Sequence, residues 1–98
     1  MDAYFMLNGI TFVWDDEKAR INPINHDGVT FQQATEAFFD PFLVVVDASR
    51  SEETRDAVIG FDRRWSLLYV VYIDRENDTI RLISARKATR KERNYYEG

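Results

Sequence analysis

The chain contains no cysteine, a single histidine and only four glycines among its 98 residues. Without cysteine it can form neither a disulfide framework, nor a thiolate zinc site, nor a cysteine nucleophile. The glycines stand singly at positions 9, 28, 60 and 98, so no glycine-rich loop can cradle the phosphates of a nucleotide. No serine lies in a Gly-x-Ser-x-Gly setting, and a metal site would have to use scattered carboxylates. We therefore expect neither a metal ion nor another cofactor.

Long apolar runs are also lacking. The longest, at residues 42–46 and 67–73, are far shorter than the roughly 20 residues that cross a bilayer. The first eight residues have no basic start followed by a long apolar stretch, so we expect no signal peptide, no membrane contact and a cytoplasmic location. The length is that of one ordinary domain, and we expect residues 1–98 to form a single domain.

The net charge of −4 conceals a split along the chain. Residues 1–80 hold 7 Lys and Arg against 15 Asp and Glu, a net of −8, whereas residues 81–98 hold 6 against 2, a net of +4. Basic side chains with tyrosines nearby suit phosphate chemistry without a metal, since arginine binds phosphate oxygens in a bidentate way. The alternative, which composition alone favours, is a solvated charged face on a terminal helix. His26 likewise has two interpretations, a general base or a helix cap.

Local patterns predict a fold of the α+β class. Residues 10–14 are β-branched and aromatic, and Asp15 follows as the N-cap of a helix that Pro23 should end near Asn22. Thr30 with Gln33 forms a capping box ahead of a second helix that stops at Asp40. Four strands and a last helix, which begins at the capping box of Thr89 and Glu92, complete the chain. The predicted strands are residues 42–47, 56–61, 66–73 and 79–85.

The resulting order β-α-α-β-β-β-β-α predicts an antiparallel sheet with helices packed on it. Strict alternation along the last strand would place Arg81, Ile83 and Ala85 on one face, and Ile80, Leu82 and Ser84 on the other. We expect Trp14, Phe38 and Phe39 to fill the core. Tyr95 and Tyr96 are adjacent on a helix and point about 100° apart, so at most one of them can face a site.

Several motifs occur together in an order that resembles the BrnT family, the toxin half of type II toxin–antitoxin pairs, with a RelE-like fold. The resemblance covers residues 12–97. Its pieces are Trp14-Asp15-x-x-Lys18, then Asn22 and His26, and the run Ser84-Ala85-Arg86-Lys87-Ala88-Thr89 followed by Glu92 and Tyr96.

The resemblance implies a metal-independent RNA endonuclease that inhibits translation. It also implies a small DNA-binding (BrnA-like) antitoxin, with two toxins on an antitoxin dimer. Because the chain lacks a helix-turn-helix and carries net negative charge, we expect the toxin itself to contact DNA little. Carried onto this chain, it gives the catalytic residues as His26, Arg55, Arg81, Arg86 and Tyr96. For binding RNA we add five further cations: Arg63, Arg64, Lys87, Arg90 and Lys91.

Two departures from the family pattern support a competing hypothesis. Many members carry a basic residue where this chain has Asn25 and Ser66. Arg63 and Arg64 lie just upstream of Ser66 and would replace its charge if their loop folds back over the site. Together with the acidic residues 1–80, these departures support the alternative of a catalytically weak or inactive module that binds its partner, because phosphate contacts dominate affinity for nucleic acids.

Overall fold

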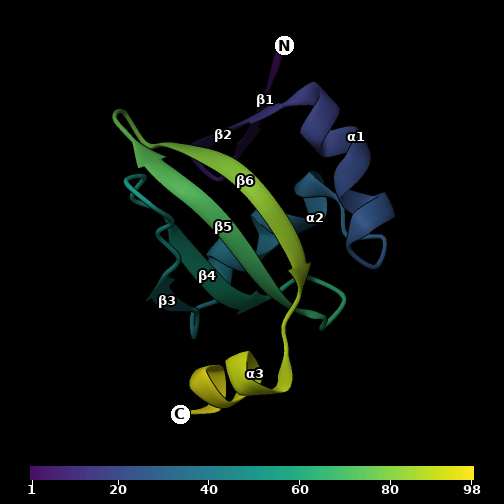
Figure 1. The fold of residues 1–98 in the computed structure, drawn as a ribbon, viewed down its shortest axis with the longest axis vertical. Helices are drawn as coiled ribbons and strands as arrows, with labels where there is room; N and C mark the ends of the chain where they lie inside the picture. Colours follow the sequence, from purple (N-terminus) through teal and green to yellow (C-terminus); the bar gives the residue numbers. More distant parts are fainter.

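A computed structural model describes all of residues 1–98 and shows a six-stranded mixed sheet with three α-helices, which confirms the α+β class (Figure 1). The elements in chain order are β1 (Asp2–Leu7), β2 (Ile10–Asp15), α1 (Asp16–Asn25), α2 (Phe31–Glu36), the 3-10 helix η1 (Ala37–Phe39), β3 (Val44–Asp47), β4 (Asp56–Phe61), β5 (Leu67–Arg75), β6 (Thr79–Lys87) and α3 (Arg90–Glu97). None of the helices is long and apolar enough to span a membrane.

The strands lie side by side in the order β1-β2-β6-β5-β4-β3. The four strands from β3 to β6 pair antiparallel, as predicted. The neighbouring strands β2 and β6 pair in parallel, which local patterns did not predict, because they are segments about 70 residues apart. Strand β1 was also missed. It forms a hairpin with β2 through Asn8 and Gly9, whose φ angles of 51° and 84° are those of an Asn-Gly turn.

The helix ends follow their capping residues. Asp15 accepts a hydrogen bond from Lys18 N at 3.1 Å, and both predicted capping boxes are present at the starts of α2 and α3. The prediction that α1 ends near Asn22 is wrong, since the helix continues to Asn25. Pro23 lies in its last turn, where a missing N–H costs only one helical bond.

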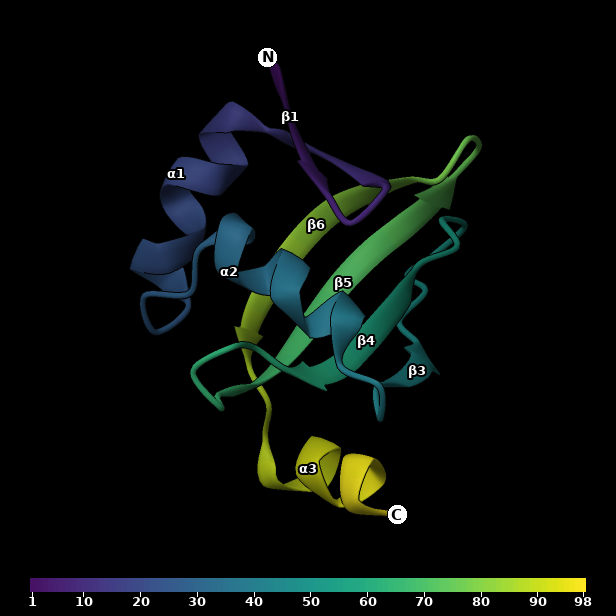
Figure 2. The same cartoon turned by 180° about the vertical axis from the view of Figure 1, so that it is seen from behind.

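The core lies between one face of the sheet and the segment α2–η1, which Figure 2 shows in front of the sheet. Trp14 is 4% exposed and belongs to this core, as predicted, and the half-buried Phe38 packs against it. Phe39 is 37% exposed, so it lies at the margin of the core. At Gly60 a Cβ atom would lie 2.6 Å from the Ala37 carbonyl oxygen, so β4 and η1 approach at backbone distance.

A β-bulge interrupts the pairing of β5 with β6. Val71 lies opposite Ser84 but Tyr72 lies opposite Leu82, so Ile83 is an extra residue in β6. Leu82 and Ala85 are therefore both buried in the core, and the expectation of strict alternation, which put Ala85 beside Arg81, is wrong. The bulge has a second consequence. Arg81 and Arg86, which are five residues apart, both project from the face opposite the core.

Candidate active site

An open groove crosses the face of β5 and β6 that α2 does not cover. Its floor is formed by the two strands, and its walls are α1 and the connection between β3 and β4. The first hollow has a volume of about 560 Å³, and its polar lining consists of Lys18, His26, Ser49, Arg50, Arg55, Tyr69, Ser84 and Arg86. An adjoining hollow of about 440 Å³ shares Lys18 and Arg55 and adds Arg75 and Arg81.

The groove brings together four of the five predicted catalytic residues. His26, Arg55 and Arg86 line the first hollow, and Arg81 lies with Arg55 in the second. These four residues come from three distant parts of the chain. Their convergence depends on the docking of α1 against the sheet and on the bulge in β6.

Tyr96 is not brought to this groove. Its hydroxyl donates a hydrogen bond to Asp40 Oδ2 at 2.7 Å, and its ring packs edge-on against Phe61 at 5.2 Å. Burial and this hydrogen bond raise the pKa of Tyr96 to about 12. Tyr95 is 57% exposed and lines neither hollow. The expectation of a tyrosine from α3 in the site fails because α3 lies beyond the end of β6, against β4 (Figure 1).

Each arginine predicted to be catalytic is bound by a carboxylate. Arg86 makes a bidentate pair with Glu92 at 2.7 and 2.8 Å, and its guanidinium lies 4.3 Å above the Tyr69 ring. Arg81 donates two hydrogen bonds to the Asp2 carboxylate at 3.1 and 3.0 Å. Arg55 Nε donates one to the Glu53 carboxylate at 2.6 Å. The carboxylates orient these guanidiniums and also neutralise them.

These ion pairs shift pKa values in the direction that favours the charged forms. The hydrogen bond to Glu92 raises the pKa of Arg86, and that to Asp2 raises the pKa of Arg81. Burial by itself would raise the pKa of Glu92, but hydrogen bonds from Arg86 and Thr89 together lower it. The arginines hold the pKa of Asp2 and Glu53 below its usual range as well. All three carboxylates are therefore ionised at neutral pH.

Three cations of the groove have no such partner. The side chains of Lys18, Arg50 and Arg75 make no hydrogen bond or salt bridge within the chain, although they line the two hollows. The sequence reasoning assigned no role to them, nor to Tyr69. Lys18 stands within a motif that was recognised, and alternation along β5 would have placed Tyr69 on the face opposite Leu68. No local pattern pointed to Arg50 or Arg75.

His26 is fixed through its backbone rather than its ring. Its N–H caps α1 by donating to the Asn22 carbonyl at 2.9 Å, whereas its imidazole has no partner within the chain. Asn22, only 5% exposed, donates to the carbonyls of Val29 and Ala85 and accepts from Ala85 N. This buried amide ties α1 to β6. The two interpretations of His26 are thus compatible, because the cap leaves the imidazole available.

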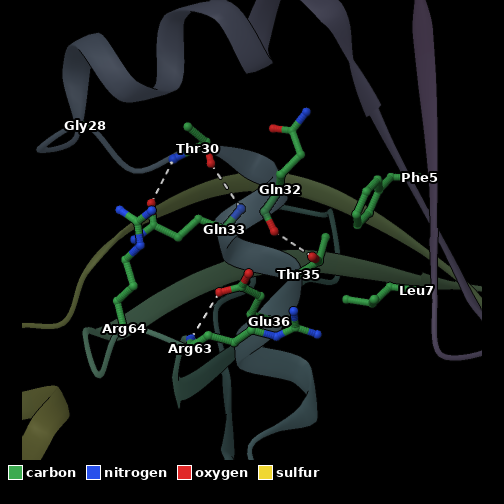
Figure 3. A pocket seen from close by; sticks show the side chains of 10 residues that line it. All are labelled: Phe5, Leu7, Gly28, Thr30, Gln32, Gln33, Thr35, Glu36, Arg63 and Arg64. Carbon is green, nitrogen blue, oxygen red and sulfur yellow. Dashed lines mark hydrogen bonds between the residues drawn. The ribbon is translucent and has the colours of Figure 1, made fainter.

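The five cations predicted to bind RNA lie outside the groove. Arg63 and Arg64 line a separate hollow of about 410 Å³ between β1 and α2 (Figure 3). Their loop does not fold back over the groove, because Glu36 accepts a hydrogen bond from Arg63 N at 3.0 Å and the buried Asp62 accepts one from Arg64 N at 2.8 Å. Lys87, Arg90 and Lys91 lie at the end of β6 and the start of α3 and line neither hollow of the groove.

No three histidine, aspartate or glutamate side chains are grouped so that they would hold a metal ion. Among protein families, the one described as "Ribonuclease toxin, BrnT, of type II toxin-antitoxin system" matches residues 14–92. Comparison with curated proteins gives no match. The matched segment contains His26, Arg55, Arg81 and Arg86, whereas Asp2 and Tyr96 lie outside it.

Proposed function

The chain belongs to the BrnT family of ribonuclease toxins from type II toxin–antitoxin systems, and we propose that the groove on β5 and β6 is its RNA-cleaving site. Such a toxin acts on RNA and has a cognate antitoxin. The observation that carries the assignment is the convergence of His26 with three arginines in two adjoining hollows. We further propose that cleavage inhibits translation, which places the action in the cytoplasm.

The proposed reaction uses a nucleophile within the RNA itself. The ribose 2′-oxygen forms a bond to the adjacent phosphorus, and the bond from phosphorus to the 5′-oxygen breaks. The proton of the 2′-hydroxyl passes to a general base, and the 5′-oxygen receives a proton from a general acid. The products are a 2′,3′-cyclic phosphate and a free 5′-hydroxyl, so the reaction needs no co-reactant.

The arginines are proposed to stabilise the charge that develops on the phosphorane. A phosphate can replace the carboxylate of Glu92 on Arg86, since both anions accept two parallel hydrogen bonds from a guanidinium. Arg81 and Arg55 support the same charge from the second hollow. Lys18 and Arg50, which have no carboxylate partner, attract the RNA before this exchange takes place.

His26 is proposed to move the proton of the 2′-hydroxyl. Imidazole is the side chain that most often serves as a general base, and that of His26 lines the first hollow with no partner within the chain. Tyr69 lies on the floor of the same hollow under Arg86. We therefore propose Tyr69, rather than Tyr96, as the group that donates a proton to the leaving oxygen.

The purified chain tests this proposal on an end-labelled single-stranded RNA in the presence of EDTA. We expect fragments that end in a 2′,3′-cyclic phosphate, and no cleavage of the same strand made of DNA. His26→Ala should lower the rate by on the order of 10²-fold or more, as is usual for loss of a general base. Arg20→Ala, which removes an exposed cation of α1 that lines neither hollow, is the matched control. Full activity of a folded His26→Ala protein would remove His26 from the mechanism.

One observation favours a second function, a catalytically weak module that binds a partner. Asp2, Glu53 and Glu92 neutralise the arginines that the chemistry needs. Expression of the chain alone, with RNA integrity followed over time, separates the two functions. Growth arrest with RNA decay is expected for the nuclease, and intact RNA at good expression for the binding module.

The antitoxin is proposed to be a small DNA-binding protein that covers the groove with complementary charge. Two toxins on an antitoxin dimer are expected. An antitoxin that binds palindromic DNA does so as a symmetric dimer, and each half of that dimer offers the same surface to one toxin. The toxin, with its net negative charge, should touch DNA little. Co-expression and light scattering on the purified complex measure this stoichiometry. Recovery of the free toxin as a monomer beside its antitoxin would contradict it.

A further inference from the structure

Trp65 is held in a backbone conformation that rarely suits a large side chain. It lies in the turn of residues 62–66 that joins β4 to β5, its φ is 64°, and it is 80% exposed. The other non-glycine residues with positive φ are Asn8, Asp27, Ser51, Asn77 and Asp78, which are all small and polar. An exposed indole contributes little to the core, and such strain is most often kept where it serves a function.

A buried carboxylate holds this turn in place. Asp62 is 4% exposed, and its Oδ1 atom accepts hydrogen bonds from the backbone N–H groups of Arg64 and Ser66 at 2.8 and 2.9 Å. Its Oδ2 atom accepts a bond from Gln33 Nε2 at 2.6 Å, which ties the turn to α2. The Trp65 ring packs edge-on against Phe61 at 5.8 Å. The indole is therefore displayed on a rigid support.

Trp65 lines a small hollow of about 220 Å³ whose other members are mainly apolar or acidic, with Arg63 as its one cation. Arg63 and Arg64 precede Trp65 directly, and their guanidinium groups form no hydrogen bond or salt bridge within the chain. The two arginines line the neighbouring hollow of Figure 3, together with the carboxylate of Glu36 and with hydroxyl and amide side chains, among which Gln32 and Gln33 project from α2. Only Phe5 and Leu7 are hydrophobic in that lining.

We propose that this turn is a second RNA contact, in which an unpaired base stacks on Trp65 and neighbouring phosphates bind Arg63 and Arg64. The inference rests on the proposed function, since it takes the ligand to be the RNA that the groove cleaves. The guanidinium groups of Arg63 and Arg64 favour RNA over a protein partner, because both lack an anionic partner within the chain and phosphates supply one. Every base has a π face, amides can bond its edges, and the guanidinium fork matches phosphate.

The two tryptophans of the chain make a direct measurement possible. Trp14 is 4% exposed and Trp65 is 80% exposed, so stacking on Trp65 should quench the protein fluorescence, whereas Trp14 should not respond. The probe is a single-stranded RNA with 2′-O-methyl riboses, which has no free 2′-hydroxyl and cannot be cleaved. Trp65→Phe leaves only Trp14, and we expect the quenching to disappear while affinity is largely retained.

Trp65→Gly is the decisive variant. Glycine adopts a positive φ without strain, so the protein should fold at least as well as the parent. Affinity for the modified RNA, measured by anisotropy of a labelled strand, should fall roughly 5- to 150-fold, the range for loss of one base–aromatic stack. The salt dependence of binding should stay unchanged, because no charge is lost. Arg64→Gln, in contrast, should reduce the slope of log K against log salt by about 0.7.

Several outcomes would overturn the inference. Parent-like affinity of Trp65→Gly, or no quenching of the parent by RNA that it binds, would exclude the stack. A variant that loses antitoxin binding but not RNA binding would assign the turn to a protein partner instead. Quenching and binding without cleavage of ordinary RNA would contradict the proposed nuclease function and leave this contact in place. A parent that binds no RNA would overturn both.

Discussion

Two groups of arginines in this protein differ in their partners. In the groove, Arg55, Arg81 and Arg86 are each bound to a carboxylate. In the turn before β5, Arg63 and Arg64 have no such partner and lie beside an exposed tryptophan. A guanidinium bound to a carboxylate has a defined orientation, but the pair carries little net charge. A guanidinium without a carboxylate partner attracts phosphate but has no fixed orientation. The first arrangement suits a transition state, which needs exact placement of charge, and the second suits binding.

Removal of Arg86 should have the largest effect, because it tests whether the paired region performs the chemistry. Arg86→Ala is expected to lower the cleavage rate by on the order of 10²-fold or more, the usual cost of one lost transition-state donor. Arg86→Lys should recover little of this, since an ammonium group lacks the bidentate fork. Rates on labelled RNA measure the effect, and Arg20→Ala, which removes an exposed arginine that lines neither hollow, is the control. Equal rates for both alanine variants would refute the role of Arg86.

Glu92→Gln would leave Arg86 of the groove without a carboxylate partner, as Arg63 and Arg64 of the turn already are. The Glu92 carboxylate accepts a hydrogen bond from Thr89 N at 2.9 Å. The amide oxygen of glutamine can accept the same bond, so the capping box of α3 should survive. Arg86 loses its counter-charge and becomes available to phosphate. RNA binding should tighten several-fold, and the slope of log K against log salt should steepen by about 0.7. An unchanged slope would mean that Arg86 does not reach the RNA backbone.

Acid should weaken the paired region and leave the turn's cations unchanged. The pKa values of Asp2, Glu53 and Glu92 lie below their usual range in the folded protein, so the unfolded chain binds more protons at low pH. Their contribution to stability is complete above the ordinary carboxyl values, about pH 4 to 5, and is lost as pH falls through the lowered folded values. We expect the melting temperature to fall by several degrees between pH 5 and pH 3. Glu92→Gln should show a shallower decline, and a parallel decline would contradict the assignment.

Arg64→Gln should have the smallest effect on folding. The side chain has no partner within the chain, and exposed positions of this kind usually change the free energy of unfolding by less than about 0.5 kcal/mol. The cleavage rate at saturating RNA should remain that of the parent. Urea unfolding and single-turnover cleavage check the two statements. A decrease of more than about 1 kcal/mol in the free energy of unfolding would contradict the lack of side-chain contacts at Arg64 in this structure.

Local signals in the sequence predicted most of the elements. Capping residues and β-branched runs gave α2, α3 and the four strands β3 to β6, because such signals act within a few residues. The Asn8-Gly9 turn is a local signal of the same kind for β1, although the predicted strands begin only at residue 10. The site was predicted in part. His26, Arg55, Arg81 and Arg86 meet in the groove, whereas Tyr96, Arg63 and Arg64 do not.

The sequence by itself determined the fold class, the helix starts, the lack of thiol chemistry and the basic C-terminal segment, since these follow from composition and short-range bonds. Tertiary structure decided which charges meet. The extra residue Ile83 in β6 brings Arg81 and Arg86 to the same face, although a regular strand would separate them. Asp2 and Glu92 reach these arginines from opposite ends of the chain. Such contacts depend on the pairing of distant strands and the docking of helices, and no local pattern encodes them.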